Sequence, residues 1–189
     1  MAKGLECDSF ICGEGTDPEV AERQLGRAPE GMIEASARCS YGAPTALLCA
    51  PIVARKGKGS SAGRQGEPFP TLYWLTCPHL KERVGRLEGG QAFLDIRRRI
   101  AEDPAFDSRL KEASENYRKL REELYEKLPD ELKASVKEKA TADLLSSGPG
   151  GVKDYRNIKC LHIHLANFIS GMDDPVGEEA SRLISGMQD

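Results

Sequence analysis

The sequence predicts an α+β fold, in which a small sheet within residues 32–77 packs against a predominantly helical C-terminal half. Three runs of β-branched, aromatic and other apolar residues predict the strands: Met32–Ala37, Ala46–Ala54 and Thr71–Thr76. From Pro78 onward, apolar residues recur at every third or fourth position, which is typical of amphipathic helices. Because 189 residues suffice for one hydrophobic core, we expect a single domain over residues 16–187.

Composition and charge exclude several classes of protein. Hydrophobic residues make up 39% and charged residues 30% of the chain, as in ordinary globular proteins. The N-terminus lacks the apolar core of a secretory signal, and no apolar run approaches a membrane span, so we expect a cytoplasmic protein without membrane association. The net charge of −3 argues against a dedicated nucleic-acid-binding protein. In a reducing compartment the six cysteines are expected to be thiols or metal ligands.

The first elements are a tail and a short helix. Residues 1–15 lack hydrophobic periodicity, and the spacing of Cys7 and Cys12 within them favours free thiols over a metal pair. Thr16–Glu19 supplies a capping hydroxyl, a proline and acidic residues, which together predict a helix start. Arg27 lies in the turn after this helix. It could contact an anionic ligand, although a solvated surface arginine is the simpler interpretation.

Two of the predicted strands flank a turn that carries Cys39. Its glycine and proline can hold a thiol on a short arm that points at a metal ion. Cys49 lies among apolar residues of the second strand and is interpreted as a small buried hydrophobe. Residues 55–69 form a polar, glycine-rich, basic insert without P-loop spacing, for which we expect a flexible loop.

The chemically richest stretch is Pro70–His79, which holds the only tryptophan, a thiol and one of three histidines. Pro78 is expected at the first position of a helix, so Cys77 lies where a strand gives way to that helix. Unpaired backbone N–H groups at a helix N-terminus favour an anion. A thiolate there could ligate a metal ion or attack a substrate, and Cys77 is a candidate for both roles.

A long helix is predicted over Phe106–Leu128. Its apolar residues recur at alternating spacings of four and three, and they form a narrow seam on an otherwise charged helix. The seam could pack in an intramolecular hairpin against a helix after Pro129, or it could bind a second copy of the chain or another protein. The short connection favours the hairpin.

The last long helix is expected over about Tyr155–Met172. By the 100° rule, Cys160 and His164 lie together at one edge of its apolar face, and His162 lies on the opposite flank. If this helix packs on the end of the sheet, Cys160 and one histidine can share a metal ion with the thiols of the sheet region. A buried Cys160, a hydrogen-bonded His162 and a surface His164 would explain the same residues equally well.

Several strings of residues occur in an order that is found in one protein family. The most specific are Pro-Phe-Pro-Thr-Leu-Tyr-Trp-Leu-Thr-Cys-Pro at 68–78 and Lys-Cys-Leu-His at 159–162. Others, over about residues 24–184, are Gln24–Arg27, Pro29, Gly31, Arg38–Cys39, Gly42, Pro44, Arg86–Glu88, Gly150–Gly151 and Pro175–Gly177. Together they resemble the bacterial domain-of-unknown-function family 501 (DUF501), which has no settled activity.

The resemblance implies a shared set of three thiols and one imidazole: Cys39, Cys77, Cys160 and His162. Three thiolates and an imidazole suit tetrahedral Zn²⁺, and three cysteines could also hold an iron–sulfur cluster. We therefore expect a Cys3His metal site of zinc or iron–sulfur type, with His164 or His79 as a reserve ligand. Where the family usually has Asn-Pro, this chain has Asp174-Pro175.

Two further hypotheses remain open on the sequence. In the first, the protein is a metal-free thiol enzyme with Cys77 as nucleophile, His162 as base and Arg27 as an anion contact. In the second, it is a non-enzymatic interaction module that docks through the Phe106–Leu128 helix, and the resemblance links it weakly to cell division. The metal site is favoured, and no substrate motif identifies a reaction.

Overall fold

The structure is a computed structural model that describes residues 13–56 and 64–187. It confirms the α+β fold. The helices of the described residues are α2 (Asp17–Leu25), α3 (Pro78–Glu88), α4 (Gln91–Glu102), α5 (Pro104–Glu126), α6 (Asp130–Ala134), α7 (Glu138–Ser146), α8 (Leu161–Ile169) and α9 (Pro175–Ser185), with a 3-10 turn η1 (Pro149–Gly151). None of these helices is both long and apolar enough to cross a membrane. Cys7, Cys12 and residues 57–63 lie outside the described residues.

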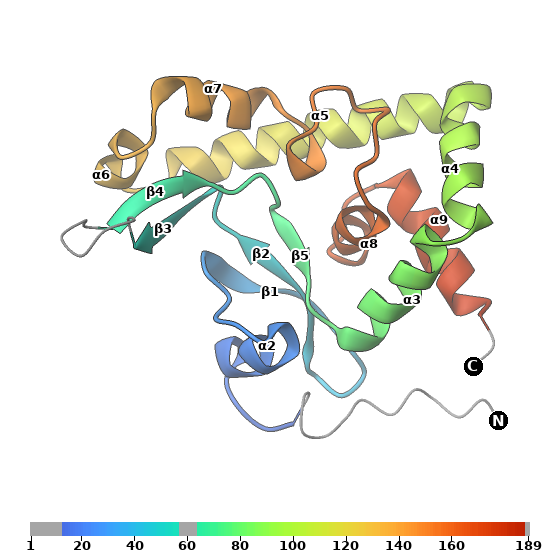
Figure 1. Cartoon of the computed structure of the whole chain (residues 1–189), viewed down its shortest axis with the longest axis horizontal. Coiled ribbons are helices and arrows are strands. Elements are labelled where there is room, and N and C mark those ends of the chain that lie inside the picture. Colours follow the sequence, from blue (N-terminus) through green and yellow to red (C-terminus); the bar gives the residue numbers. More distant parts are fainter. Residues whose placement is uncertain (1–12, 57–63, 188–189) are drawn as a thin grey trace.

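A three-stranded antiparallel sheet lies at the centre of the fold (Figure 1). Its strands, in spatial order, are β1 (Met32–Arg38), β2 (Pro44–Cys49) and β5 (Tyr73–Leu75). In the middle strand, Ala46 pairs with Ala37 on one side and with Leu75 on the other. The turn between β1 and β2 and the start of α3 both lie at one end of this sheet. The topology therefore brings Cys39 and Cys77 to the same end of the sheet.

The segment Ala46–Ala54 was predicted as one strand, but the structure divides it into β2 and β3 (Ile52–Lys56). Pro51 lies at the break, where it has no N–H to donate to a neighbouring strand. β3 pairs with β4 (Arg64–Pro68) in an antiparallel hairpin. The prediction of a loop over residues 55–69 is therefore wrong for its first and last residues, which lie in paired strands.

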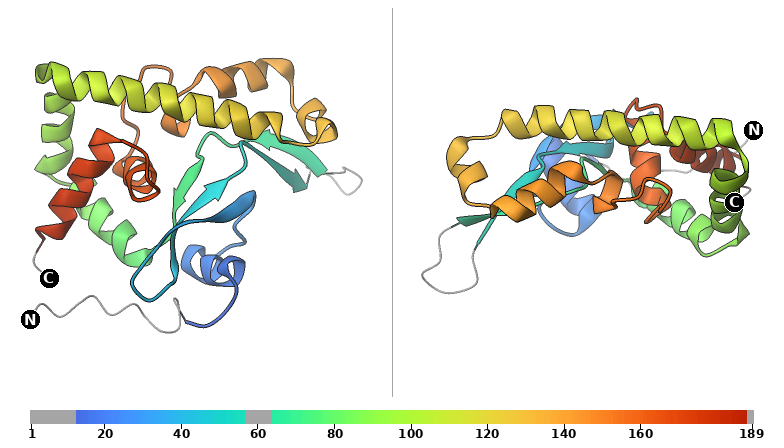
Figure 2. Two further views of the ribbon diagram at one scale, coloured as in Figure 1. Left: turned by 180° about the vertical axis from the view of Figure 1, so that it is seen from behind. Right: turned by 90° about the horizontal axis from the view of Figure 1, so that it is seen from above.

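The two faces of the central sheet are covered by different helices, because neighbouring residues of a strand point to opposite faces. Leu47 and Cys49 form a small core with Ala21 of α2. Ala46 and Leu75 belong to the main core, which lies under the C-terminal helices. The views of Figure 2 show α2 on one side of the sheet, and α3, α8 and α9 on the other.

The apolar seam of α5 is used inside the molecule. Four of its residues are at most 6% exposed: Phe106, Leu110, Ala113 and Tyr117. α5 contacts α4, α7 and α9, so its apolar seam packs against other helices of the same chain. The single helix predicted after Pro129 is instead two helices, α6 and α7, separated at residues 135–137. A partner that bound α5 would therefore meet its charged outer side.

α8 is shorter than predicted, because it begins at Leu161 rather than near Tyr155. The residues before it form a turn, in which the side chain of Asp154 accepts a hydrogen bond from the N–H of Arg156 at 3.0 Å. Such local bonds compete with helix formation. Cys160 is therefore the N-cap residue in an extended conformation, with φ −160° and ψ 154°.

α9 crosses α8 so closely that Gly177 is required. A Cβ atom at this position would overlap the carbonyl group of His164 and the Cβ of Phe168. We expect Gly177→Ala to lower the free energy of unfolding by about 2–3 kcal/mol, because backbone atoms cannot yield locally. Urea denaturation measures this, and Gly186→Ala serves as the control, since its Cβ would make only ordinary contacts. Equal stabilities of the two variants would contradict the packing argument.

Candidate functional site

The residues predicted as one site do not lie together, because they contact different parts of α3. Cys77 is the N-cap of this helix. The imidazole of His162 lies beside the carbonyl of Lys81 and the carboxylate of Glu88, which are one to three turns, or about 6–16 Å, further along the helix axis. Among the described residues, neither Cys39 nor Cys77 belongs to a group of three ligand atoms within 4.8 Å of one another. The structure therefore does not bring the expected Cys3His set together.

It does bring together Glu88, Cys160 and His162, whose potential ligand atoms all lie within 4.8 Å of one another. The His162 Nδ1 is 3.0 Å from Glu88 Oε1, and the same oxygen accepts a hydrogen bond from the N–H of Leu161. The side chains of His162 and Glu88 are 31% and 25% exposed, respectively. The group is thus partly open to solvent.

The local backbone explains why Cys160 joins His162 rather than His164. The 100° rule placed Cys160 with His164, but this rule applies only to residues within a helix. Cys160 is extended, so its side chain leaves the helix pattern and lies next to the His162 ring. The expected pairing of Cys160 with His164 is therefore wrong.

The surroundings of His162 favour its protonated form. Its pKa is raised, chiefly by a hydrogen bond with the Cys160 thiol and also by the Glu88 carboxylate, whereas burial opposes the shift. Nε2 lies 3.3 Å from the carbonyl oxygen of Lys81. Since the carbonyl and the carboxylate only accept hydrogen bonds, both ring nitrogens donate in this arrangement.

Glu88 is the ligand candidate that sequence reasoning missed. It ends α3, 72 positions before Cys160, and no spacing rule links the two (160 − 88 = 72). The available signal was the string Arg86–Glu88 within the family resemblance. A carboxylate, a thiolate and an imidazole are all ordinary zinc ligands, so the donor set fits that metal ion.

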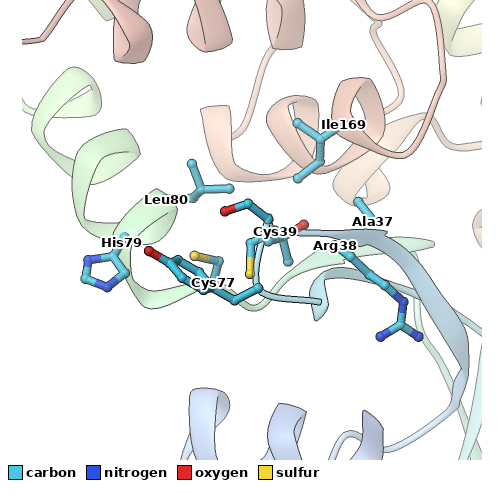
Figure 3. A pocket seen from close by; sticks show the side chains of 10 residues that line it. Ala37, Arg38, Cys39, Cys77, His79, Leu80 and Ile169 are labelled. Atoms are coloured by element: carbon cyan, nitrogen blue, oxygen red, sulfur yellow. The ribbon is translucent and has the colours of Figure 1, made fainter. Parts of the chain in front are cut away.

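Cys39 and Cys77 line a separate cavity of about 400 Å³ at the N-terminal end of α3. Figure 3 shows both thiols there, with Leu80 and Ile169 above them and the His79 ring at one side. Cys77 is 7% exposed. This cavity thus collects two of the predicted thiols without the third.

His164 belongs to a third place, the junction of α8 and α9. Its Nδ1 lies 2.8 Å from Asp174 Oδ2, and both residues are buried. Burial alone would raise the pKa of Asp174, but the charge and hydrogen bond of His164, with bonds from Asn167 and Gly177, lower it. Asp174 also caps α9 through the N–H groups of Val176 and Gly177. The role of the Asp174-Pro175 motif is therefore to join the two helices.

Two remaining residues lie away from these groups. The guanidinium of Arg27 stacks over the Trp74 ring at 4.7 Å from its centroid, so its described partner is an aromatic ring. Cys49 is fully buried, and burial raises the pKa of its thiol to about 12. The interpretation of Cys49 as a small buried hydrophobe is confirmed.

Comparison with known proteins gives one match. A family model described as "Protein of unknown function (DUF501)" matches residues 35–182 of the 189-residue chain. No curated protein and no solved structure matches the chain significantly. The matched region contains the Glu88, Cys160 and His162 group, the thiol cavity and the Asp174 junction.

Proposed function

Since the chain belongs to the DUF501 family of proteins of unknown function, we propose a function from its own geometry: it binds one divalent metal ion, zinc by preference, through Glu88, Cys160 and His162. The ion would link the C-terminal end of α3 to the N-terminal end of α8. This proposal replaces Cys39 and Cys77 of the expected ligand set with Glu88.

The orientation of the His162 ring is the observation that carries this proposal. A metal-binding histidine usually donates its second ring N–H to a carbonyl or carboxylate, which fixes the ring. Here Nε2 faces the carbonyl of Lys81, and Nδ1 faces Glu88 and lies in the group with Cys160. A metal ion at Nδ1 would replace the proton that Nδ1 shares with the carboxylate.

The donor set favours zinc over an iron–sulfur cluster. Clusters of that kind are held by four ligands, at least two of which are cysteines. Within the described residues, Cys160 is the one thiol of the group. One thiolate, one imidazole and one carboxylate instead suit a zinc site with three protein ligands and an open fourth position.

Partial exposure is consistent with that open position. The side chains of Glu88 and His162 keep a quarter to a third of their surface in contact with solvent. A zinc ion with a free position supplies Lewis-acid activation of a bound water or carbonyl. The group therefore supports a role in small-molecule chemistry as well as a structural one.

The metal-free thiol enzyme has less support. Its proposed base, His162, must accept a proton from its nucleophile, Cys77, but Cys77 lies outside the group that contains His162. In addition, both ring nitrogens of His162 already face acceptor oxygens. The hydrogen bond that the ring does make with a thiol is to Cys160 rather than to Cys77.

Metal analysis of protein purified without a metal-affinity tag tests the proposal. We expect about one zinc per chain in the parent protein, and at least a tenfold lower occupancy in Cys160→Ser and His162→Ala, because second-sphere changes alone cost 10–100-fold in affinity. Cys39→Ser is the matched control, since Cys39 is also a partly buried free thiol. It should retain the zinc, as should Cys77→Ser.

Two outcomes would overturn the assignment. One is full zinc occupancy in Cys160→Ser and His162→Ala at normal stability. The other is loss of zinc in Cys39→Ser and Cys77→Ser together, which would restore the original Cys3His set. Glu88→Gln distinguishes the carboxylate as a ligand, because the amide keeps its size but binds zinc poorly.

A further inference from the structure

The outer edge of the central sheet is open in the described structure. β1 is the last strand on its side, and β2 is the strand with which it pairs. Apart from that pairing, no backbone hydrogen bond joins residues 33–38 to another described segment. In Figure 1, β1 is the outermost strand and α2 lies next to it. The N–H and C=O groups along such an edge can pair with an extended segment of another molecule.

A groove of about 540 Å³ lies between α2 and the beginning of β1. Its apolar lining includes Pro18 of α2, Pro29 of the turn that follows this helix, and Met32 and Ile33 of β1. Successive side chains of a strand point to opposite sides, so a strand added to β1 would direct every second side chain toward this groove. Backbone pairing with a sheet edge, combined with space for alternate side chains, is a common mode of peptide recognition.

A β-bulge turns one apolar side chain of β1 toward the groove. Met32 pairs with Cys49 and Glu34 pairs with Leu48, so Ile33 is an extra residue between two consecutive residues of β2. Bulges of this kind re-aim a side chain. Ile33 lines the groove and is 50% exposed. Apolar side chains of an added strand would therefore bury Ile33, which has no such cover in the described structure.

The charge of the groove is negative and only partly compensated. Four carboxylates line it, and no lysine or arginine does. Asp17 and Glu30 are paired with arginines of β1 and β3, respectively. Glu22 and Glu34 are both exposed, and neither has an ion-pair partner among the described residues. Complementary charge favours a correct partner and like charge rejects a wrong one, so the groove selects a basic segment.

We infer that β1 and this groove bind an extended segment of a partner protein that carries both basic and apolar side chains. The backbone of the segment pairs with residues 33–38. Its apolar side chains cover Ile33, and its lysine or arginine side chains lie beside Glu22 and Glu34. This surface shares no residue with the group of Glu88, Cys160 and His162, so the inference is independent of the proposed metal ion.

Nuclear magnetic resonance of the full chain, labelled with ¹⁵N, tests the inference with a synthetic probe, acetyl-Lys-Val-Lys-Val-Lys-Val-amide. We expect the peptide to shift the amide resonances of residues 33–38 in a saturable manner and to slow their hydrogen exchange. The matched peptide with glutamate in place of lysine should bind about tenfold more weakly or worse, because it brings like charges together. Added salt should also weaken the binding of the lysine peptide, since it screens exposed charges.

Two variants separate the charge from the apolar contact. The double variant Glu22→Lys, Glu34→Lys should weaken binding of the lysine peptide about tenfold or more. Its control is the double variant Glu112→Lys, Glu115→Lys, which makes the same change of charge on the exposed side of α5 and should leave the affinity unaltered. Ile33→Ser should weaken binding about tenfold, because less apolar surface is buried. All three substituted glutamate and isoleucine positions near the groove are exposed, so the variants should keep the parent unfolding temperature.

Several results would overturn the inference. They are equal affinities for the lysine and glutamate peptides, unchanged affinity in the Glu22 and Glu34 double variant, and shifts confined to residues outside β1 and α2. Sedimentation that shows a dimer of the parent protein, with the amides of residues 33–38 already protected from exchange, would assign this edge to a second copy of the chain instead. None of these results bears on zinc occupancy, so failure here leaves the metal proposal unaffected.

Discussion

Replacement of Arg121 by methionine is expected to destabilise the protein by about 3 kcal/mol, because several buried backbone oxygens lose their donor. The Arg121 side chain is fully buried. Its guanidinium donates to the carbonyls of Leu144 at 2.8 Å, Pro70 at 2.9 Å and Gly148 at 3.0 Å, and also to Ser147. It therefore joins the end of α7 to the segment before β5.

The environment of Arg121 contains little that compensates its charge. Burial lowers the pKa of its guanidinium, and the neighbouring Tyr117 ring, 4.9 Å from the guanidinium carbon, opposes the shift. Its hydrogen-bond acceptors in the described structure are neutral oxygens. A planar group with several fixed donors is needed to reach them together, so lysine cannot replace it.

Chemical denaturation of Arg121→Met and Arg121→Lys measures this effect. Both variants should lose stability, and Lys119→Met serves as the control, because Lys119 is exposed on the same helix. The Ser147–Gly148 segment should also exchange its amide hydrogens faster in the Arg121 variants. A loss below 1 kcal/mol with unchanged exchange would show that the guanidinium is dispensable.

The second large effect is expected at Asp174. Asp174→Ala should cost about 3–5 kcal/mol, because it removes the acceptor of several buried hydrogen-bond donors at once. Four groups lose their acceptor: the His164 ring, the Asn167 amide, and the N–H groups of Val176 and Gly177. The α8–α9 junction then has unpaired polar groups in its core.

Asp174→Asn separates the capping role from the charge. An asparagine oxygen can still cap α9, so this variant should lose about 1–2 kcal/mol less than alanine does. The family resemblance, in which Asn usually precedes this proline, also implies that an amide is tolerated. Equal loss in both variants would show that the negative charge beside His164 is essential.

The contribution of Asp174 should depend on pH with a definite sign. The pKa of this carboxyl group is lower in the folded protein than in the unfolded chain. Its stabilising contribution is therefore fully present above the unfolded value of about 4 and is lost as the pH falls through the folded value. The stability difference between parent and Asp174→Asn should narrow below about pH 4. A constant difference from pH 7 to pH 3 would contradict this.

Local patterns predicted most of the secondary structure. The capped start of α2, the strand of β1, and the strand-to-helix change at Cys77 and Pro78 all depend on residues close in sequence. The errors arose where a local signal competed with a pattern: Pro51 interrupts an apolar run, and the Asp154 turn delays α8 until Leu161. In both cases the hydrophobic pattern predicted that a strand or helix is present, and the local backbone conformation decided where it begins or ends.

The sequence alone also indicated two stretches with reactive chemistry, Pro70–His79 and Cys160–His164, because all three histidines lie in them and each stretch also holds a cysteine. Only the tertiary structure decided which of them meet. The length of α3 separates Cys77 from the group that Glu88 completes, and the extended N-cap turns Cys160 toward His162. Contacts between distant segments depend on how whole elements pack, so the sequence could name the thiol and imidazole candidates, but it could neither single out Glu88 nor group these side chains.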